Sequence, residues 1–578
     1  MPETETTFSA WNPGLEPEIP RAYLTLETIH RPENVTTALA DVSELSTLTG
    51  LNAEELVAFR PERLMLHELI VRITADIVVQ EGESEEALGL HFREIVHTIM
   101  DTYLQPRLTE IERDFTQLSD QVQQVVHTQL ATTLFAPTKP ESDNKSSQKR
   151  FPFNWFRSRK PTPPAETESI QEKHYRLISG FKDQGLAAED PLQQAVFKSL
   201  YRVLGSIAST HGYVITDQTL LEQLVTRHVC NNYGSRLIRR AISSSIDEAI
   251  QQQGYSRLPC AEKPILLSLK GASAAGKSTS RPMLKTIMGE KGIQPDNYGT
   301  ISPDIWRRLL LDYESLGEAY KYAGRLTSNE VNIVDNKLDR YIRDKANRDH
   351  AIPNLLVDRF RFDSFSTEKV SQILHGTYAS YVDTLYMYFI VTPPEATVER
   401  GWERGLVRGR YKAVEDFLGH SVEAYVGMPK LFFKWMAYRQ PLFKYVFLDN
   451  SVPKGTTPKT IAEGTQQAMD IYNPIAFIDI ERYQKINIKA KCPEDVYPPA
   501  PILAIERNSG FLRQCIKQLP VVNFIDEVSS KTYLRSEGGV FEIVDGEIMQ
   551  SRLAEQPELA ELFKLIAPEV ASCTCRLG

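Results

Sequence analysis

Residues 265–284 read ILLSLKGASAAGKSTSRPML, and this stretch decides the fold class of the chain. It begins with an apolar run typical of a buried strand, continues through a turn of small residues, and ends in residues suited to a helix. Gly271, four small residues, Gly276, Lys277 and Ser278 satisfy the pattern G-x-x-x-x-G-K-[ST]. A strand, a glycine-containing turn and a helix in this order are the context that a phosphate-binding loop requires.

Each part of this loop has a physical task. The glycines permit a tight turn whose amides point inward, and the following helix adds the positive end of its dipole. We expect Lys277 to reach the β- and γ-phosphates of a nucleotide and the Ser278 hydroxyl to bind Mg²⁺. The alternative is an ordinary strand-to-helix turn with an exposed lysine, and Pro282 removes one backbone donor from the first turns of the expected helix. The residues expected to hold nucleotide are Gly271, Ala272, Ser273, Ala274, Ala275, Gly276, Lys277, Ser278 and Thr279.

Short apolar runs alternate with long helical segments on both sides of the loop. The runs are PILLSLK, NYGTIS, NLLVD, LYMYFIV and YVFLD. This alternation is typical of strands joined by crossover helices. We therefore predict an α/β domain over residues 261–470, with a parallel sheet of about five strands flanked by helices.

The rest of the chain divides by composition. Residues 1–135 and 169–260 carry apolar positions at helical spacing, which predicts a mainly α-helical N-terminal domain and a helical neck. Residues 136–168 are rich in Pro, Ser and charge, as flexible linkers are. Residues 471–578 are predicted to form a small α+β region with a hairpin in TYLRSEGGVFEIVDGEIMQ.

Composition limits the classes of function. A length of 578 residues predicts two to four domains, and a net charge of -9 argues against extensive nucleic-acid binding. The acidic, Pro-rich start lacks the apolar region of a secretory signal, and no apolar run is long enough for a transmembrane segment. Six scattered cysteines suit a reducing compartment. We therefore expect a cytoplasmic protein, and an effector delivered into a host cytosol is also compatible with these features.

One part of the linker has a distinct composition. Residues 149–160, KRFPFNWFRSRK, interleave basic and aromatic side chains. Such a stretch can dock on an anionic membrane surface or in a groove of a partner protein. The alternative is a solvated linker in which a few residues are pinned to a neighbouring domain.

Carboxylates follow two of the predicted strands. Asp304, in TISPDIWRRLLLDY, lies at a helix start beyond the second strand, where α/β folds place their ligands. It would accept the proton of an attacking hydroxyl, although aspartate is also favoured in any first helical turn. Asp358 ends the strand NLLVD and is a candidate for supporting Mg²⁺ or holding substrate, and Asp363 is a weaker candidate.

A helix is predicted after the fourth strand. In VTPPEATVERGWERGLVRGRYKAVEDFLGH, Thr392, Pro393 and Glu395 have the spacing of a capping box with Pro at the first helical position. Gly405 is the expected helix end.

The same segment contains four arginines. Arg400 and Arg404 lie one helical turn apart, and Arg408 and Arg410 follow in a glycine-broken segment. A mobile segment of this kind can close over bound nucleotide and neutralise the transferring phosphoryl group. The alternative is that these are solvated helix arginines.

With these pieces assembled, residues 262–455 resemble the zeta-toxin family of P-loop small-molecule kinases. They resemble more loosely the wider group of chloramphenicol phosphotransferases and polynucleotide kinases. The order and spacing of the pieces carry more weight than any one motif, and the resemblance covers about a third of the chain. The matching pieces are GASAAGKS, ISPDIWRR, NLLVD, IVTPPEATVERGWERGLVRGRY and YVFLDNS.

The resemblance implies a chemistry for the site. Mg-ATP would be the phosphoryl donor, Asp304 the general base, and Lys277 and Ser278 the residues on phosphate and metal. Zeta toxins typically phosphorylate a nucleotide-sugar such as UDP-N-acetylglucosamine, and an acidic-Gly-Thr element after the third strand helps to hold it. This chain has VDRFRF there, with Arg359 and Phe360 in those places, so the acceptor is left open. The lid arginines would be found among Arg400, Arg404, Arg408 and Arg410.

Two other functions stay open at this point. A kinase of the same fold could act on a nucleic-acid end or a protein side chain, which would require a basic, aromatic-lined channel. Alternatively, the P-loop domain could be a non-catalytic ATP-binding switch or scaffold, with the helical regions contacting a partner or membrane. Replacing Asp304 would then leave function intact.

Overall fold

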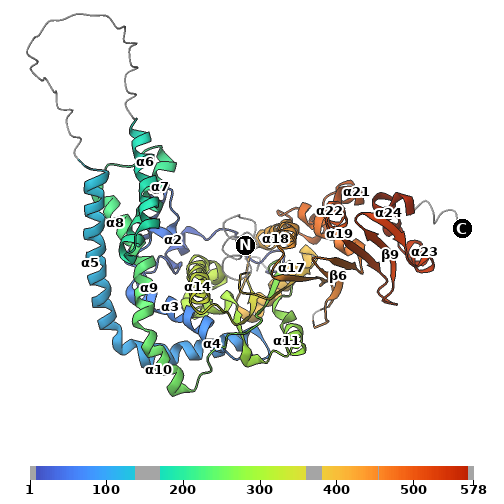
Figure 1. The fold of residues 1–578 in the computed structure, drawn as a ribbon, viewed down its shortest axis with the longest axis horizontal. Coiled ribbons are helices and arrows are strands. Elements are labelled where there is room, and N and C mark those ends of the chain that lie inside the picture. Colours follow the sequence, from blue (N-terminus) through green and yellow to red (C-terminus); the bar gives the residue numbers. More distant parts are fainter. Residues whose placement is uncertain (1–7, 137–168, 360–379, 454, 571–578) are drawn as a thin grey trace, which may run out of the picture. The chain divides into compact units, whose positions relative to one another are not determined.

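The computed structural model divides the chain into two compact units, each assembled from separate stretches of sequence (Figure 1). The first unit comprises Met1–Thr28, His67–Tyr103 and Ser244–Gly578, and the second comprises Ile29–Leu66 and Leu104–Ser243. The residues described are 8–136, 169–359, 380–453 and 455–570.

Three features expected from the sequence lie outside these described residues. They are the basic and aromatic stretch 149–160, Phe360 and Asp363. The boundaries of the five consecutive segments expected from the sequence also stay predictions.

The first unit contains one ten-stranded sheet with the strand order β10-β9-β8-β7-β6-β5-β4-β1-β3-β2. The strands are β1 Ile265–Gly271, β2 Tyr298–Ile301, β3 Asn354–Asp358, β4 Thr384–Val391, β5 Leu442–Asp449, β6 Lys459–Thr465, β7 Ala468–Ile471, β8 Val521–Ile525, β9 Thr532–Glu537 and β10 Val540–Ile543.

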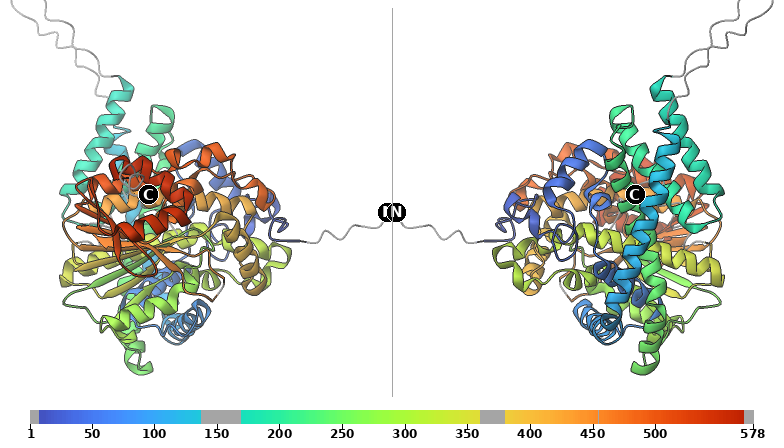
Figure 2. Two further views of the ribbon diagram at one scale, coloured as in Figure 1. Left: turned by 90° about the vertical axis from the view of Figure 1, so that its right-hand side faces the viewer. Right: turned by 90° about the vertical axis from the view of Figure 1, so that its left-hand side faces the viewer.

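Strands β1 to β5 form the parallel part of the sheet, which confirms the predicted fold class. Each corresponds to one of the five apolar runs in the sequence. In the centre, β1 lies between β3 and β4, and Leu267 pairs with Leu356 on one side and Tyr386 on the other. Because helices lie on both sides of the sheet, both faces of β1 are buried and its sequence is apolar with little alternation (Figure 2).

The C-terminal strands continue the same sheet. β6 is antiparallel to β5, β8 is parallel to β7, and β9 and β10 form an antiparallel hairpin. Gly538 and Gly539 turn this hairpin with φ angles of 57° and 88°, as the sequence predicts. The described residues after 471 form both strands and helices, as expected for an α+β region, and these strands extend the sheet that contains β1 to β5.

The helices of the first unit include those that flank the sheet. Two helices contain a point at which the chain passes from one unit to the other. α3 contains the step from Leu66 to His67, and α10 contains the step from Ser243 to Ser244. The helices are α3 Pro61–Asp76, α4 Glu85–Ile99, α10 Ser243–Gln253, α11 Arg281–Glu290, α12 Arg307–Leu310, α13 Ala323–Leu326, α14 Ser328–Asp349, α17 Pro394–Arg408, α18 Val414–Met436, α19 Pro474–Arg482, α20 Ala500–Leu503, α21 Ile505–Asn508, α22 Gly510–Gln518, α23 Gly546–Glu555 and α24 Pro557–Ile566.

The second unit is helical in its described part. Apolar residues of α5 and α7 at helical spacing form its core, among them Val122, Val126, Val196 and Val203. Its helices are α1 Leu39–Thr49, α2 Ala53–Leu56, α5 Leu108–Thr133, α6 Ile170–Ala187, α7 Pro191–His211, α8 Gln218–Val229 and α9 Ser235–Ala241. No described helix of either unit is both long and apolar enough to cross a membrane.

The helix after β4 differs from its prediction at both ends. α17 starts at Pro394, and the Thr392 side chain, instead of capping the helix, donates a hydrogen bond to the carbonyl of Ala275. The helix ends at Gly409, whose φ of 65° is the left-handed conformation of a helix stop. Gly405 lies inside the helix, and glycine is suited to this position because a Cβ there would lie 2.5 Å from the Tyr411 ring.

Candidate functional site

The loop after β1 is closed by hydrogen bonds from its lysine to its own backbone. Lys277 Nζ donates hydrogen bonds to the carbonyl oxygens of Gly271 and Ala272 at 3.0 and 2.9 Å. Ala274 and Gly276 have φ angles of 61° and 97°, which turn the backbone sharply at the positions where the motif places its small residues. The loop therefore closes into a compact cradle.

The remaining loop residues complete the cradle. Ala272, Ser273 and Ala275 are buried, whereas Thr279 Oγ1 donates to the carbonyl of Gly276 at 2.7 Å. A short 3₁₀ turn, η5 Ser278–Ser280, leads into α11, so Pro282 falls in the first turn, where a missing backbone donor has no helical partner to lose.

Two neighbouring strand ends hold the loop in place. Asn450, directly after β5, donates its side-chain amide to the carbonyl of Ala275 at 2.7 Å, and Thr392, directly after β4, donates its hydroxyl to the same oxygen at 3.0 Å. The Tyr425 hydroxyl in turn accepts from the backbone N–H of Thr392 at 2.7 Å. The role of Asn450 was missed from the sequence, although its place after a parallel strand is a usual place for ligand-site residues.

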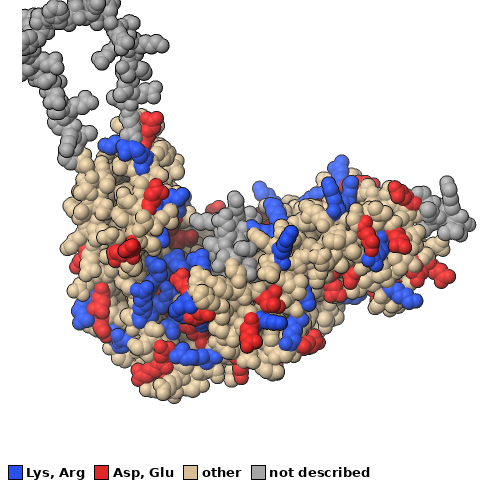
Figure 3. Space-filling model, viewed as in Figure 1, with Lys and Arg blue, Asp and Glu red and all other residues tan. Residues whose placement is uncertain are grey.

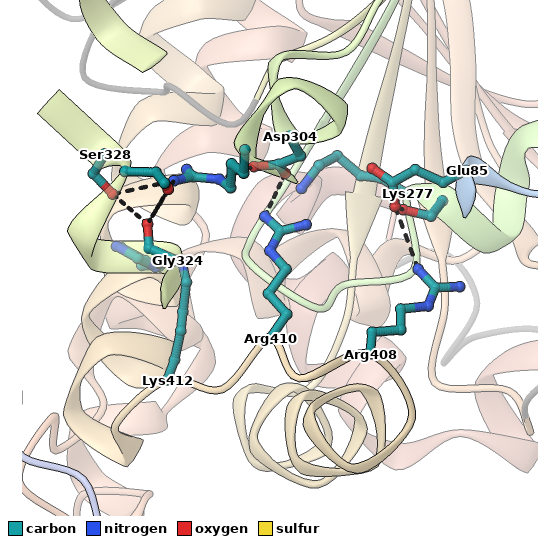
Figure 4. Close-up of polar contacts among 12 residues, drawn as sticks. Glu85, Lys277, Asp304, Gly324, Ser328, Arg408, Arg410 and Lys412 are labelled. Atoms are coloured by element: carbon teal, nitrogen blue, oxygen red, sulfur yellow. Dashed lines mark hydrogen bonds and ion pairs between the residues drawn. The ribbon is translucent and has the colours of Figure 1, made fainter. Parts of the chain in front are cut away.

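The loop lysine has a shifted protonation equilibrium. Burial lowers the pKa of Lys277, while the carboxylates of Asp358 and Asp304 act against this and the guanidinium groups of Arg404 and Arg410 add to it. The lysine thus lies where charges of both signs converge. Figure 4 shows Lys277, Asp304 and Arg410 close to one another.

Asp304 occupies the position expected for it, in the turn η7 Pro303–Trp306 after β2. Its Oδ1 accepts from Arg307 Nε at 2.9 Å and its Oδ2 from Arg410 Nη2. Burial alone would raise the pKa of this carboxyl, but the two arginines hold the pKa well below its usual range. The carboxylate is consequently ionised at neutral pH.

Asp358 ends β3 beside the loop. Burial raises the pKa of its carboxyl, the nearby carboxylates of Glu85 and Asp304 raise it further, and Lys277 lowers it. In the described part of the chain, no group of three His, Cys, Asp or Glu side chains has the arrangement of a metal centre.

Two of the four candidate arginines, Arg404 and Arg410, lie near Asp304. Arg410 binds it directly, and the buried Nε and Nη2 atoms of Arg404 donate no hydrogen bond within the described residues. Burial and the charge of Arg410 lower the pKa of Arg404 to about 9. A buried guanidinium with open donors and a destabilised positive charge is suited to an anion.

Arg400 lies elsewhere. Its Nη2 donates to the carbonyl oxygens of Asn450 and Val452, both at 2.9 Å. It therefore orders the segment that carries Asn450, and its predicted contact with phosphate stays a prediction.

The site also contains a carboxylate that no sequence motif predicts. Glu85, the first residue of α4, accepts a hydrogen bond from the Ser278 hydroxyl, with Oε2 and Oγ 2.7 Å apart. Arg408 Nη1 lies 3.4 Å from the same oxygen, and Arg408 Nε lies 2.7 Å from Glu86 Oε1. Residues 85 and 278 belong to no common motif, so only the folded chain shows their proximity.

A cavity of about 430 Å³ opens beside Asp304. Its wall includes Asp358, Arg410, Lys412 and His420. Lys412 Nζ and His420 Nδ1 are 3.1 Å apart, and burial lowers the pKa of both groups, with mutual repulsion adding to the shift of His420. The cavity therefore combines charged groups with apolar residues such as Leu15 and Ile19, and it has room for a small molecule at the Asp304 carboxylate.

Arg359 replaces a residue of the acidic-Gly-Thr element expected from the resemblance. Its guanidinium lies 2.7 Å from Asp339 and 2.8 Å from Asp335, so it is anchored to α14 at the wall of the cavity. The chain thus lines this part of the cavity with an ion-paired arginine.

Comparisons with known proteins give structural similarities over part of the chain. No family model and no curated protein matches it. The AvrRxo1-ORF1:AvrRxo1-ORF2 structure with sulphate ions is 15% identical in sequence to the matched part of this chain, with a TM-score of 0.29. The match covers 38% of this chain and 65% of the chain in that structure, just under two thirds. The AvrRxo1-ORF1:-ORF2 structure with ATP is 14% identical, with a TM-score of 0.31 over 46% of this chain and 79% of the other. The PezAT chromosomal toxin–antitoxin system of Streptococcus pneumoniae is 16% identical, with a TM-score of 0.26 over 38% and 79%.

Proposed function

We propose that the protein is an ATP-dependent kinase that transfers the γ-phosphoryl group of Mg-ATP to a hydroxyl of a small metabolite. The observation that carries this proposal is the convergence of the Lys277 loop, Arg404 and Arg410 on Asp304, beside a cavity of about 430 Å³. A nucleotide-sugar such as UDP-N-acetylglucosamine is the first acceptor to test.

The loop residues fit the phosphates of ATP. Gly276 allows the backbone to turn where a Cβ would lie 2.2 Å from Asn450 Nδ2. Arg404 has buried donors for which the described residues supply no acceptor. The Walker A residues Lys277 and Ser278 would bind the phosphates and their Mg²⁺, with Asp358 beside them. Bound Mg²⁺ would neutralise charge on the phosphoryl group.

The acceptor would enter through the cavity and present its hydroxyl to Asp304. In the described arrangement both carboxylate oxygens are held by arginines. Arg410 would leave Asp304 for the phosphoryl group, which frees Oδ2 to accept the hydroxyl hydrogen bond. The acceptor oxygen then bonds to phosphorus, its proton passes to Asp304, and the bond to the departing ADP breaks.

The charge of the surface bears on the size of the acceptor. Basic and acidic side chains are intermixed on the face that Figure 3 shows. A channel for a nucleic-acid end would favour a continuous basic track, whereas the cavity at Asp304 is bounded by residues of both signs. A small, polar acceptor therefore fits best.

The proposal is tested by mass spectrometry of reaction mixtures. Full-length protein is incubated with Mg-ATP and a panel of nucleotide-sugars, nucleosides and cell-extract metabolites, in parallel with Lys277→Ala and Asp304→Asn. Asp296→Asn is the matched control because Asp296 is exposed in the turn before β2. A phosphate-sized mass gain on one compound, present in the control and absent in both site variants, would establish the kinase.

Other outcomes point to the alternatives. Transfer that persists in folded Asp304→Asn would remove Asp304 as the base. If ATP binds but no compound gains the mass of a phosphate, even when protein and nucleic-acid acceptors are added, the non-catalytic switch is favoured.

A further inference from the structure

The N-terminal end of α4 projects a carboxylate onto the phosphate-binding loop. Glu85 is the first residue of this helix, and the Ser84 side chain caps it by accepting from the Ala87 backbone at 3.2 Å. Only 8% of Glu85 is exposed, and its Oε2 accepts from Ser278 Oγ at 2.7 Å. The hydroxyl that would bind a nucleotide's metal therefore donates its proton to Glu85 in this arrangement, and it holds the carboxylate beside the phosphate-binding loop.

The same carboxylate lies among the cations expected to meet phosphate. Arg408 Nη1 lies 3.4 Å from it, and Figure 4 shows Arg408 directed at Glu85. The charge of Glu85 also raises the pKa of Arg410, after the larger effect of Asp304, and it acts on Arg404 in the same direction. Glu85 thus supplies a negative charge where the ATP phosphates would supply theirs.

The segment before Glu85 is fixed to the fold on two sides. Lys285, from α11, donates to the carbonyl of Gly82, and Thr300, from β2, donates to Glu81. On the other side, α4 packs on the turn that carries Asp304, where a Cβ on Gly89 would lie 3.6 Å from Ile305. Glu85 is therefore presented from an anchored helix end and not from a loose side chain.

We propose that Glu85 is an autoinhibitory residue that competes with the phosphates of ATP for Ser278 and Arg408. This inference rests on the proposed function, because it concerns access to the same loop. ATP binds after the α4 end withdraws, and Arg408 exchanges Glu85 and Glu86 for phosphate. A signal that pulls α4 away would activate the enzyme.

The physical reason is like-charge exclusion. A carboxylate hydrogen-bonded to the loop hydroxyl and the phosphates of ATP cannot share one small, partly desolvated space. If only a fraction of molecules has Glu85 withdrawn, the apparent Kd for ATP is the intrinsic Kd divided by that fraction. Removing the charge raises the fraction and lowers the apparent Kd.

The opposite role is that Glu85 helps to hold Mg²⁺ beside Ser278. The ion pair of Glu85 with Arg408, at 3.4 Å, argues against it, because a carboxylate that is paired with a guanidinium is a weakened metal ligand. The two roles predict changes of opposite sign, so one measurement separates them.

The test is calorimetric binding of Mg-ATP to the full-length chain and to Glu85→Gln. The glutamine keeps the shape and loses the charge, and we expect it to bind ATP about tenfold more tightly or better, the effect of one charge-assisted hydrogen bond. Glu94→Gln, an exposed position on the same helix, is the matched control and should leave the Kd unchanged. An unchanged or weaker affinity in folded Glu85→Gln would overturn the inference.

Failure of the proposed function would look different. If wild-type protein binds ATP as tightly as Glu85→Gln does, and Lys277→Ala abolishes binding, the nucleotide site is supported and the autoinhibitory role of Glu85 is rejected. If no folded protein binds ATP, Glu85→Gln included, both the proposed ATP-dependent function and the autoinhibitory role of Glu85 are rejected.

A second measurement uses the wild-type protein, so it does not depend on how the variant folds. Saturating Mg-ATP should increase hydrogen exchange in residues 81–89, because the α4 end loses its contact with the loop. Unchanged or slower exchange there, with ATP bound, would contradict the withdrawal.

Discussion

The side-chain amide of Asn450 donates to the carbonyl oxygen of Ala275 at 2.7 Å, and this hydrogen bond joins the end of β5 to the phosphate-binding loop. The next residue of the loop is Gly276, which has no room for a side chain because a Cβ would lie 2.2 Å from the same amide nitrogen. The loop and the strand end thus fit together only with glycine at this position.

Gly276→Ala should disturb the loop from both directions. The φ of 97° is unfavourable for alanine, and the Asn450 contact must break, so we expect a loss of about 1–3 kcal/mol in the free energy of unfolding. ATP binding should weaken at least tenfold, measured by calorimetry. Gly289→Ala in α11 is the control, because its Cβ would meet no atom within 4 Å and alanine favours a helix. Equal stability and equal ATP affinity of the two variants would contradict the tight fit.

Arg404→Met should separate stability from catalysis. Two buried guanidinium nitrogens lack acceptors in the described residues, so replacing the side chain by an apolar one should stabilise the ATP-free protein by about 1 kcal/mol. The rate of phosphoryl transfer should fall by about 10²-fold or more, because a positive charge on the phosphoryl group is lost. Thermal melting and kcat measure the two effects, with exposed Arg439→Met as control. A destabilised Arg404→Met with normal kcat would assign Arg404 a structural role only.

Arg400→Ala should act mainly on nucleotide affinity. The substitution frees the carbonyl oxygens of Asn450 and Val452 and loosens the segment that holds Ala275. We expect the KM for ATP to rise about tenfold with a smaller change in kcat, the reverse of the pattern for Arg404→Met. A loss confined to kcat would instead place Arg400 at the transferring phosphoryl group.

The ion pairs of Asp304 predict a dependence of stability on pH. Because the pKa of its carboxyl is lower in the folded than in the unfolded protein, its contribution to stability is present above the unfolded pKa of about 4 and is lost as pH falls through the folded pKa. Asp304→Asn should therefore lower the Tm at pH 7, and the difference from wild type should shrink below about pH 4. A difference that is constant from pH 7 to pH 3 would show that the carboxylate charge contributes no stability.

The parallel part of the fold could be predicted from the sequence because its central strands, β1, β3 and β4, are almost entirely buried. Such strands are short with an apolar centre, as β3 is between Asn354 and Asp358, so they stand out from the helices between them. The loop at residues 271–278 could be located for a related reason, since its small residues, lysine and serine are adjacent in the chain.

The remaining features depend on contacts between distant residues. Gly405 and Gly409 are both of the residue type that ends helices. Only the folded chain shows that Gly405 lies inside α17, packed against the Tyr411 ring, and that Gly409 ends the helix. Arg400 and Arg404 share one helix face by spacing, yet one binds backbone carbonyls and the other faces the Asp304 cluster. Glu85 reaches Ser278 across 193 positions of sequence, which no local pattern encodes.

The position of β1 in the sheet also bears on the order in which the protein matures on the ribosome. β1 is flanked by β3 and β4, and the loop after it needs Asn450, which follows β5. At translation rates of 5–20 residues per second, the partners of the loop emerge roughly 10 to 40 s after the loop itself. The α4 carboxylate is made before either, so the nascent chain carries its inhibitor before it has a nucleotide site to block.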